Sequence, residues 1–177
     1  MARSDSFQER LRPVKEPLFG YALALTRDRE KASDLFQECI LRALAARDVP
    51  DHDAAFKSWL FAIMRNRWID ARRSEQRQEG RLRELDYLAS EASPDLGSVV
   101  VNQIAVRQAF GALSLDHRDV LALVDIAGFG YEETARLLSV PKGTVMSRVS
   151  RARRELCRLL SAPDVVVLRR SGRVGSD

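Results

Sequence analysis

Apolar positions recur every three or four residues from about Phe7 to Arg73, with polar positions between them. In "PLFGYALALT" they are Leu18, Tyr21, Ala22 and Leu25, and "REKASDLFQECILRALAAR" continues the same spacing. This spacing predicts amphipathic helices that bury one face. The segment "FKSWLFAIMRNRWIDARR" is apolar on nearly every side as far as Met64 and polar beyond it. We therefore expect a helix at the centre of a bundle, with its C-terminal half emerging into solvent.

The pattern is interrupted over residues 74–98 and then resumes. The interrupting segment is charged and then acidic, contains Pro94 and Gly97 and lacks a strong apolar face, which predicts a flexible acidic linker. Helical spacing returns in "VNQIAVRQAFGAL", "SLDHRDVLALVDIAG", "YEETARLLSV" and "PKGTVMSRVSRARRELCRLL". Ser114 or Asp116 can cap the second of these segments by accepting a hydrogen bond from its first turn.

The predicted fold is all-α, because period-two strand patterns are nearly absent and Gly and Pro are scarce. Two small helical domains are expected, the first a bundle and the second a four-helix unit. The predicted boundaries are a first domain at 1–73, a linker at 74–98, a second domain at 99–162 and a loose C-terminal tail at 163–177.

The last helical segment separates an apolar stripe from a polar, arginine-rich face. At 100° per residue the apolar side holds Val145, Val149, Ala152, Leu156, Leu159 and Leu160. The opposite side holds Thr144, Ser147, Arg148, Arg151, Arg154, Glu155 and Arg158. A short turn with Pro141 and Gly143 joins this helix to the preceding one. Two helices joined by so short a turn, the second with polar and arginine side chains on its outer face, predict a helix-turn-helix that contacts DNA.

Charge is distributed unevenly around a modest net value of +4. Val140–Leu160 has six basic residues against one acid, and Arg65–Arg83 has seven against three. Glu84–Ser98 has four acids and no base, and Asp28–Phe56 has seven acids against four bases. Two separate basic patches predict two contacts with a polyanion, and the acidic surfaces suggest a different partner. Solvated surface charge is the alternative for either patch alone.

Several classes of function find no support in the sequence. Cys39 and Cys157 have no ligand at metal-binding spacing, and His52 and His117 stand alone, so neither a metal nor another cofactor is expected. No nucleophile–base arrangement or phosphate-binding glycine loop is present, which argues against an enzyme with a small-molecule substrate. No apolar run reaches the ~18 residues of a membrane span and no signal-peptide core is seen, so we expect a cytoplasmic protein.

Three motifs together resemble one known family. "GYEETARLLSVPKGTVMSRVSRARREL" resembles region four of the bacterial extracytoplasmic-function (ECF) sigma factors, members of the sigma-70 family. Their usual form is Tyr-Glu-Glu-Ile-Ala, then Pro-x-Gly-Thr-Val-x-Ser-Arg-x-x-Arg-Ala-Arg. "LTRDREKASDLFQECILRAL" and "FKSWLFAIMRNRWIDARR" are similar to region two, with its Asp-Leu-x-Gln-Glu and Trp-Leu-x-x-Ile-x-x-Asn-x-x-x-Asp signatures. The resemblance covers about Leu18–Arg73 and Ala109–Leu160, in family order.

The resemblance implies two roles for the first domain. The positions that match the family's docking surface for core RNA polymerase are Asp34, Leu35, Gln37 and Glu38. Asn66 matches the asparagine that helps to hold a flipped base of the minus-ten element, with Ile63 and Ala46 beside it. An amide can pair with the Watson–Crick edge of an unstacked base. The arginines expected to neutralise nearby phosphates are Arg65, Arg67, Arg72 and Arg73.

For the second domain the resemblance implies contact with duplex DNA at the minus-thirty-five element. Ser147, Arg148 and Arg151 match the base-reading positions. The expected supporting contacts are Tyr131, Glu132, Lys142, Thr144 and Met146. The sequence departs from its relatives at Val124 and Met146, where arginine is frequent, and at Ser150, where an aromatic residue can occur. These departures predict a different preferred sequence.

The partners implied are core RNA polymerase, promoter DNA and an anti-sigma factor that covers both binding faces. Two other functions remain open from the residues alone. An ordinary helix-turn-helix regulator would bind duplex DNA without joining polymerase. A protein-interaction module would dock its basic helices on an acidic partner.

Overall fold

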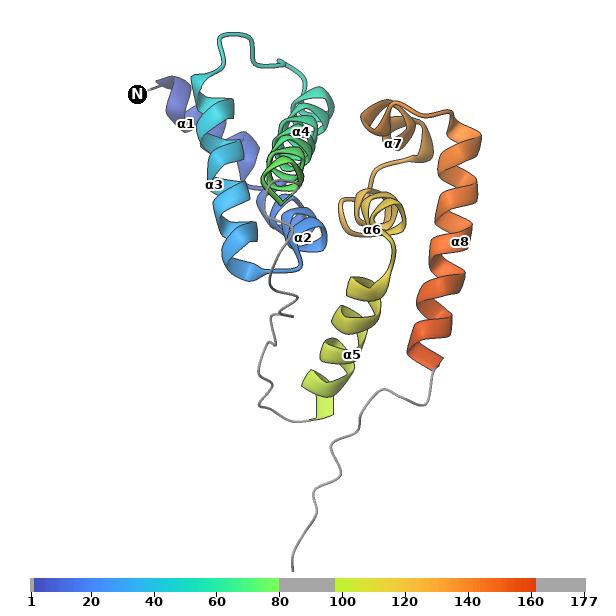
Figure 1. Cartoon of the computed structure of the whole chain (residues 1–177). Coiled ribbons are helices and arrows are strands. Elements are labelled where there is room, and N and C mark those ends of the chain that lie inside the picture. Colours follow the sequence, from blue (N-terminus) through green and yellow to red (C-terminus); the bar gives the residue numbers. More distant parts are fainter. Residues whose placement is uncertain (1, 80–97, 162–177) are drawn as a thin grey trace, which may run out of the picture.

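The computed structural model describes residues 2–79 and 98–161, and all of its regular structure there is helical (Figure 1). The first group of helices comprises α1 (Ala2–Leu11), α2 (Lys15–Thr26), α3 (Arg29–Ala45) and α4 (Asp53–Glu79). The second comprises α5 (Ser98–Ala112), α6 (Leu115–Leu121), the π-helical turn η1 (Ala122–Ile126), α7 (Tyr131–Leu138) and α8 (Lys142–Ser161). Most of the predicted linker and the predicted tail lie outside the described residues.

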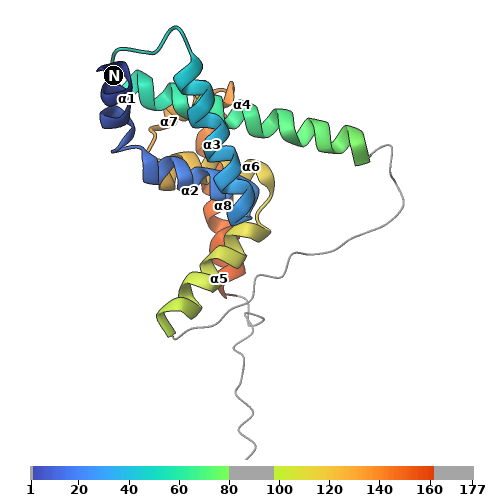
Figure 2. The ribbon, with the colours of Figure 1, turned by 90° about the vertical axis from the view of Figure 1, so that its left-hand side faces the viewer.

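The first group is a bundle around α4, as the apolar pattern predicted. Leu60, Phe61 and Met64 are fully buried, residues 65–69 are mostly partly buried, and the helix is largely polar and exposed from Asp70 onward. α4 then continues to Glu79, beyond the boundary predicted at Arg73, and its end projects away from the bundle (Figure 2). Residues 74–79 favour helix through Glu, Gln and Arg, which need no buried face to extend a helix already formed.

The second group contains the predicted helix-turn-helix. Ser114 caps α6, since its Oγ accepts a hydrogen bond from the His117 N–H at 3.4 Å. Gly128, with φ 71°, ends the η1 turn in a left-handed conformation. α7 and α8 are joined by a short turn, and Val145, Val149 and Ala152 of α8 are buried. The predicted apolar stripe is confirmed at these three positions, Leu156 and Leu159 are partly buried, and Leu160, predicted on the same stripe, is 38% exposed near the end of the helix.

The two groups lie side by side and share one hydrophobic core. Phe61 of α4 meets Phe129, just before α7, edge to face with ring centroids 4.9 Å apart. α2 packs against η1 at Gly20, where an added Cβ would lie only 2.9 Å from Ile126 Cγ2. Lys57 donates a hydrogen bond to the Ala127 carbonyl oxygen at 2.6 Å. No sequence pattern predicted this docking, because its contacts join residues far apart in the chain.

Each helix in residues 2–79 and 98–161 is too short or too polar to span a lipid bilayer.

Candidate nucleic-acid and polymerase interfaces

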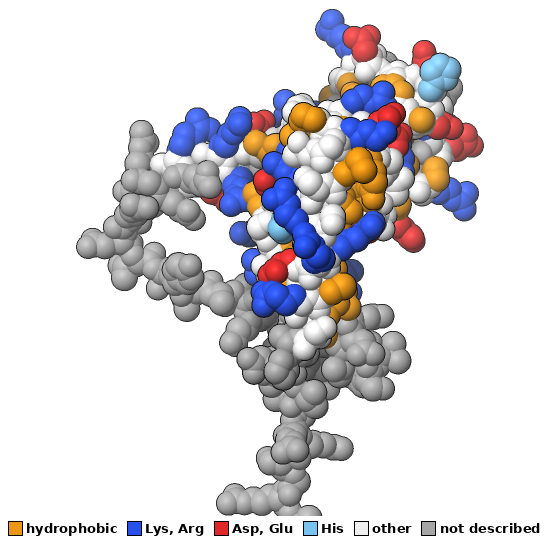
Figure 3. Space-filling model, turned by 90° about the vertical axis from the view of Figure 1, so that its right-hand side faces the viewer, with side chains coloured by type: hydrophobic (Ala, Val, Ile, Leu, Met, Phe, Trp, Pro, Cys, Tyr) orange, Lys and Arg blue, Asp and Glu red, His pale blue; other side chains and the backbone are white. Residues whose placement is uncertain are grey.

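The polar face of α8 is exposed, and basic side chains follow it along one side of the molecule (Figure 3). Ser147 and Arg151 are linked, because the Arg151 guanidinium donates to the Ser147 carbonyl and hydroxyl oxygens at 3.3 Å. The Ser147 hydroxyl in turn donates to the Thr144 carbonyl at 3.0 Å. These bonds align the side chains along the helix and leave the rest of the Arg151 guanidinium for a partner.

The remaining residues predicted for duplex contact have different surroundings. Arg148 pairs with Asp116 of α6 at 3.1 Å and is partly buried, so it is less accessible than Arg151. Glu132 at the start of α7 pairs with Lys142 at the start of α8 at 2.6 Å, which ties the two helices together. The bond and charge of Lys142 lower the pKa of Glu132, so this carboxylate stays ionised. Tyr131 and Thr144 are partly exposed, and Met146 is 50% exposed.

The predicted minus-ten residues divide between the surface and the interior. Asn66, Arg73 and the partly exposed Arg72 lie on the outer part of α4, with Arg72 over the Trp68 ring. Arg67 pairs with Glu38 of α3 at 2.6 Å. Ile63 packs against the core, and Ala46 follows the end of α3 in extended conformation.

Arg65 differs from the other arginines of α4 because it points towards the second group of helices. Its Nε donates to Asp119 Oδ2 of α6 at 2.9 Å, and Asp119 Oδ1 accepts a 2.6 Å hydrogen bond from the Tyr21 hydroxyl. Burial and the neighbouring Asp119 charge raise the pKa of Tyr21 well above its usual value. Tyr21 therefore remains a neutral donor, and the three side chains form a polar link between the two groups of helices.

The predicted polymerase-docking residues form a stripe on the outside of α3, with one exception. Asp34, Gln37 and Glu38 are exposed, whereas Leu35 is only 8% exposed and packs into the core. Leu41, which the sequence analysis did not select, is 67% exposed and continues the same stripe three residues beyond Glu38. A helical wheel of α3 places Leu41 on the same face as Asp34 and Glu38, so the sequence held the signal for this residue.

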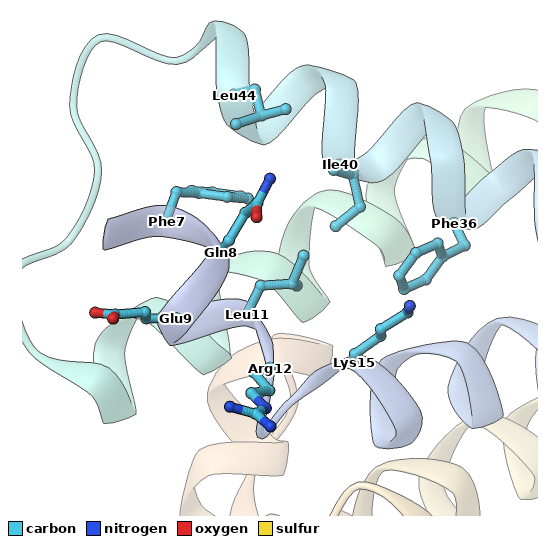
Figure 4. A pocket seen from close by; sticks show the side chains of 9 residues that line it. All are labelled: Phe7, Gln8, Glu9, Leu11, Arg12, Lys15, Phe36, Ile40 and Leu44. Atoms are coloured by element: carbon cyan, nitrogen blue, oxygen red, sulfur yellow. The ribbon is translucent and has the colours of Figure 1, made fainter. Parts of the chain in front are cut away.

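An apolar groove lies next to this stripe (Figure 4). It has a volume of 570 Å³, and Figure 4 shows side chains of α3 on one side and of α1 on the other. Its apolar lining is Phe7, Leu11, Phe36, Ile40 and Leu44, and its polar lining is Gln8 and Glu9 of α1, Arg12 just after α1 and Lys15 of α2. The outer side of α3 thus combines carboxylates and an amide with exposed apolar area, which suits a partner helix that is both basic and apolar.

The two cysteines have different surroundings. Cys39 is buried, its Sγ lies 3.5 Å from the Leu60 carbonyl oxygen, and burial raises the pKa of its thiol to about 12. The thiol is therefore protonated and inert at neutral pH. Cys157 is exposed on α8. Within residues 2–79 and 98–161, no group of three or more His, Cys, Asp or Glu could hold a metal ion.

Comparison with known proteins finds two family models in order along the chain. Sigma-70 region 2 matches residues 11–78, and sigma-70 region 4 matches residues 103–156. The chain is 32% identical over 160 residues to the ECF RNA polymerase sigma factor EcfG of Rhodopseudomonas palustris, covering 90% of this chain and 88% of that protein. It is 33% identical over 156 residues to the ECF sigma factor SigM of Mycobacterium tuberculosis, covering 88% of this chain and 77% of SigM.

A solved structure agrees in fold over nearly the same span. The sigma factor RpoE of Bartonella quintana, crystallised in complex with the anti-sigma factor NepR, matches with a TM-score of 0.73 and 31% identity. The match covers 89% of this chain and 98% of RpoE. The similarity therefore includes both groups of helices.

Proposed function

The chain belongs to the ECF RNA polymerase sigma factors, and from this membership we propose that it binds core RNA polymerase and directs transcription initiation at specific promoters. The proposed assignment gives residues 1–73 to core polymerase and the minus-ten element and residues 99–162 to the minus-thirty-five element. The proposed place of action is the cytoplasm. Sigma factors are not enzymes, so the activity is one of binding and positioning.

The observation that carries the proposal is the presence of three distinct faces on one chain. α3 offers a mixed acidic and apolar stripe, α4 offers an exposed amide beside arginines, and α8 offers an arginine-rich helix face. A helix-turn-helix regulator that acts without polymerase would need only the last of these. A region-two match beside the helix-turn-helix therefore favours a sigma factor over that alternative.

The proposed mechanism uses binding energy to open the promoter without bond chemistry. α8 holds intact duplex, while α4 holds an unstacked base of the opened strand. Both helices belong to a chain bound to one polymerase, so once one DNA contact has formed, formation of the other is effectively intramolecular. The combined free energy of the two contacts offsets the few kcal/mol needed to unstack a base. Modest affinity at each contact is then sufficient.

A decisive test is run-off transcription with purified full-length chain, core polymerase and a library of promoters. We expect promoter-specific transcripts that require both the chain and the core enzyme. Binding to duplex DNA with no association with core polymerase, in the absence of any inhibitor, would support the regulator instead.

Asn66→Ala is expected to weaken strand opening while leaving binding to a duplex minus-thirty-five site nearly unchanged. The side chain is exposed on α4 and contributes no core contact, so the fold should be retained. Permanganate footprinting of melted thymines measures opening, and fluorescence anisotropy measures duplex binding. Gln108→Ala, at another exposed amide, on α5, is the control. Equal losses of opening and duplex binding would refute this division of labour.

Arg151→Ala is expected to cost about 1–3 kcal/mol of binding free energy at a cognate duplex, because a bidentate contact to guanine is lost. Binding isotherms on cognate and scrambled duplexes check this, and the discrimination between them should shrink. Arg158→Ala is the matched control on the same helix, since Arg158 pairs with Glu155 beyond the proposed base-reading positions. An unchanged isotherm for Arg151→Ala would contradict the assignment.

An anti-sigma factor is the proposed regulator. RpoE, the structural relative, was crystallised with such a partner. The exposed stripe of α3 and its apolar groove offer a surface that an inhibitor could cover in competition with polymerase. This competition predicts that polymerase and the inhibitor exclude one another on the chain.

A further inference from the structure

A second cavity lies where the two groups of helices meet. It has a volume of 410 Å³ and is lined by α2, α3 and α4 on one side and by Arg118 of α6 on the other. Its basic lining is Arg27, Lys31, Arg67, Arg72 and Arg118, and its acidic lining is Asp34, Glu38 and Glu75. Because Glu38 is paired with Arg67, four basic and two acidic side chains remain, and of these Arg27, Lys31, Asp34 and Glu75 are exposed. The junction pocket is therefore basic, with its most deeply buried charge contributed by Arg118.

Arg118 is a buried cation whose donors are incompletely paired among the described residues. It is 8% exposed, and within the part of the chain that the structure describes its buried Nε and Nη1 atoms have no hydrogen-bond partner. Burial lowers the pKa of Arg118, and the positive charges of Arg27 and Arg72 lower it further. A guanidinium taken out of water without an acceptor is strongly disfavoured, so an anion in this pocket would stabilise the arrangement.

Arg27 is held towards the same place by an unusual backbone. It ends α2 with φ 62°, in the left-handed region where glycine is the usual residue. Its side chain reaches α5 of the other group, where its Nε lies 3.4 Å from the position of an added Cβ on Gly111. The side chain of Arg27 therefore lines the junction pocket and also reaches the second group of helices.

We propose that the junction pocket binds a phosphate-type oxyanion, which bridges Arg118 of the second group to Arg27 and Arg72 of the first. Planar guanidinium groups bind phosphate oxygens through paired hydrogen bonds, and convergence of several is typical of such sites. The volume accommodates a phosphate or a pyrophosphate. Arg72 is also one of the arginines proposed to contact minus-ten phosphates, so the site shares this side chain with promoter recognition, whereas Arg27 and Arg118 have no assigned role there.

Thermal unfolding of the full chain tests the proposal, with inorganic phosphate or pyrophosphate compared against chloride at equal ionic strength. For the wild type we expect the midpoint to rise by about 3–6 °C at ten times the dissociation constant. Arg118→Gln should abolish this rise, and it should be at least as stable as wild type in chloride because it removes an unpaired buried charge. An equal rise in the wild type and in Arg118→Gln would overturn the proposal, as would no rise in the wild type.

Two further variants keep the test independent of any folding defect. Arg72 is partly exposed on α4, so its replacement should leave the fold intact. Arg72→Gln should weaken phosphate binding, measured by calorimetry, at least several-fold. Arg42→Gln, exposed on α3 outside the pocket, should bind as the wild type does, and equal weakening by both would overturn the proposal.

Adding oligothymidylate identifies the source of the oxyanion. Displacement of phosphate that depends on Arg118 would assign the site to nucleic-acid phosphodiesters, and no displacement would assign it to a free phosphorylated ligand.

Discussion

Replacing Asp119 with alanine is expected to lower the free energy of unfolding by about 3–5 kcal/mol, because it removes one member of a buried ion pair. The side chain of Asp119 is 8% exposed and that of Arg65 is 22% exposed. Without the carboxylate, Arg65 would lose its partner and the Tyr21 hydroxyl would lose its acceptor inside the core. Urea unfolding measures the loss, and small-angle X-ray scattering would detect separation of the two groups of helices.

Two variants define what the Asp119 result means. Asp119→Asn retains an oxygen acceptor for Tyr21 and should lose less stability than Asp119→Ala. Asp116→Ala removes the partner of Arg148 at a carboxylate that is 65% exposed, so its effect should stay within about 1 kcal/mol. If Asp116→Ala and Asp119→Ala were equally destabilising, the polar link between the groups would have no special role.

Phe61→Ala is expected to destabilise the protein by about 3–5 kcal/mol, because it opens a cavity in the shared core. The Phe61 side chain is fully buried, contacts Phe129 edge to face, and lies with its ring centroid 5.3 Å from that of Tyr21. The cavity would therefore border both groups of helices. Chemical unfolding followed by circular dichroism gives the free energy, and a single transition should become broader if the groups then unfold separately.

The control for Phe61→Ala is truncation of an exposed apolar side chain, which creates no cavity. Leu41→Ala truncates a side chain that is 67% exposed on α3, and its effect on stability should stay within about 0.5 kcal/mol. Phe61→Leu should fall between the two, since it retains part of the volume. A loss below 1 kcal/mol for Phe61→Ala would contradict the shared core.

Local pattern predicted most of the helices and much of the α8 surface. The spacing of Val145, Val149 and Ala152 predicted the buried side of α8, and the opposite side is polar and mostly exposed. The apolar run around Phe61 predicted a central helix with a polar C-terminal half, and α4 has this character. These features follow from the 3.6-residue period, which places residues on faces of a helix whatever the helix packs against.

The expected polymerase and minus-ten residues show where local pattern was insufficient. Motif matching selected Leu35, which is buried, and omitted Leu41, which is exposed on the same helix. It treated Arg65 and Arg67 alike, although Arg65 pairs with buried Asp119 and Arg67 with exposed Glu38. A motif records which residue types occur at each spacing, whereas exposure depends on what packs against the helix.

The sequence by itself determined most of the helices, the helix-turn-helix and the family, because each depends on residues close together in the chain. Only the tertiary structure decided that the two groups share a core, that Asp119 links Tyr21 and Arg65, and that Arg118 faces Arg27 and Arg72. The Tyr21–Asp119 and Arg65–Asp119 bonds join residues 98 and 54 positions apart. Helical periodicity specifies which face of each helix is apolar, but the pairing of those faces depends on shape and charge complementarity that arises only when the helices pack together.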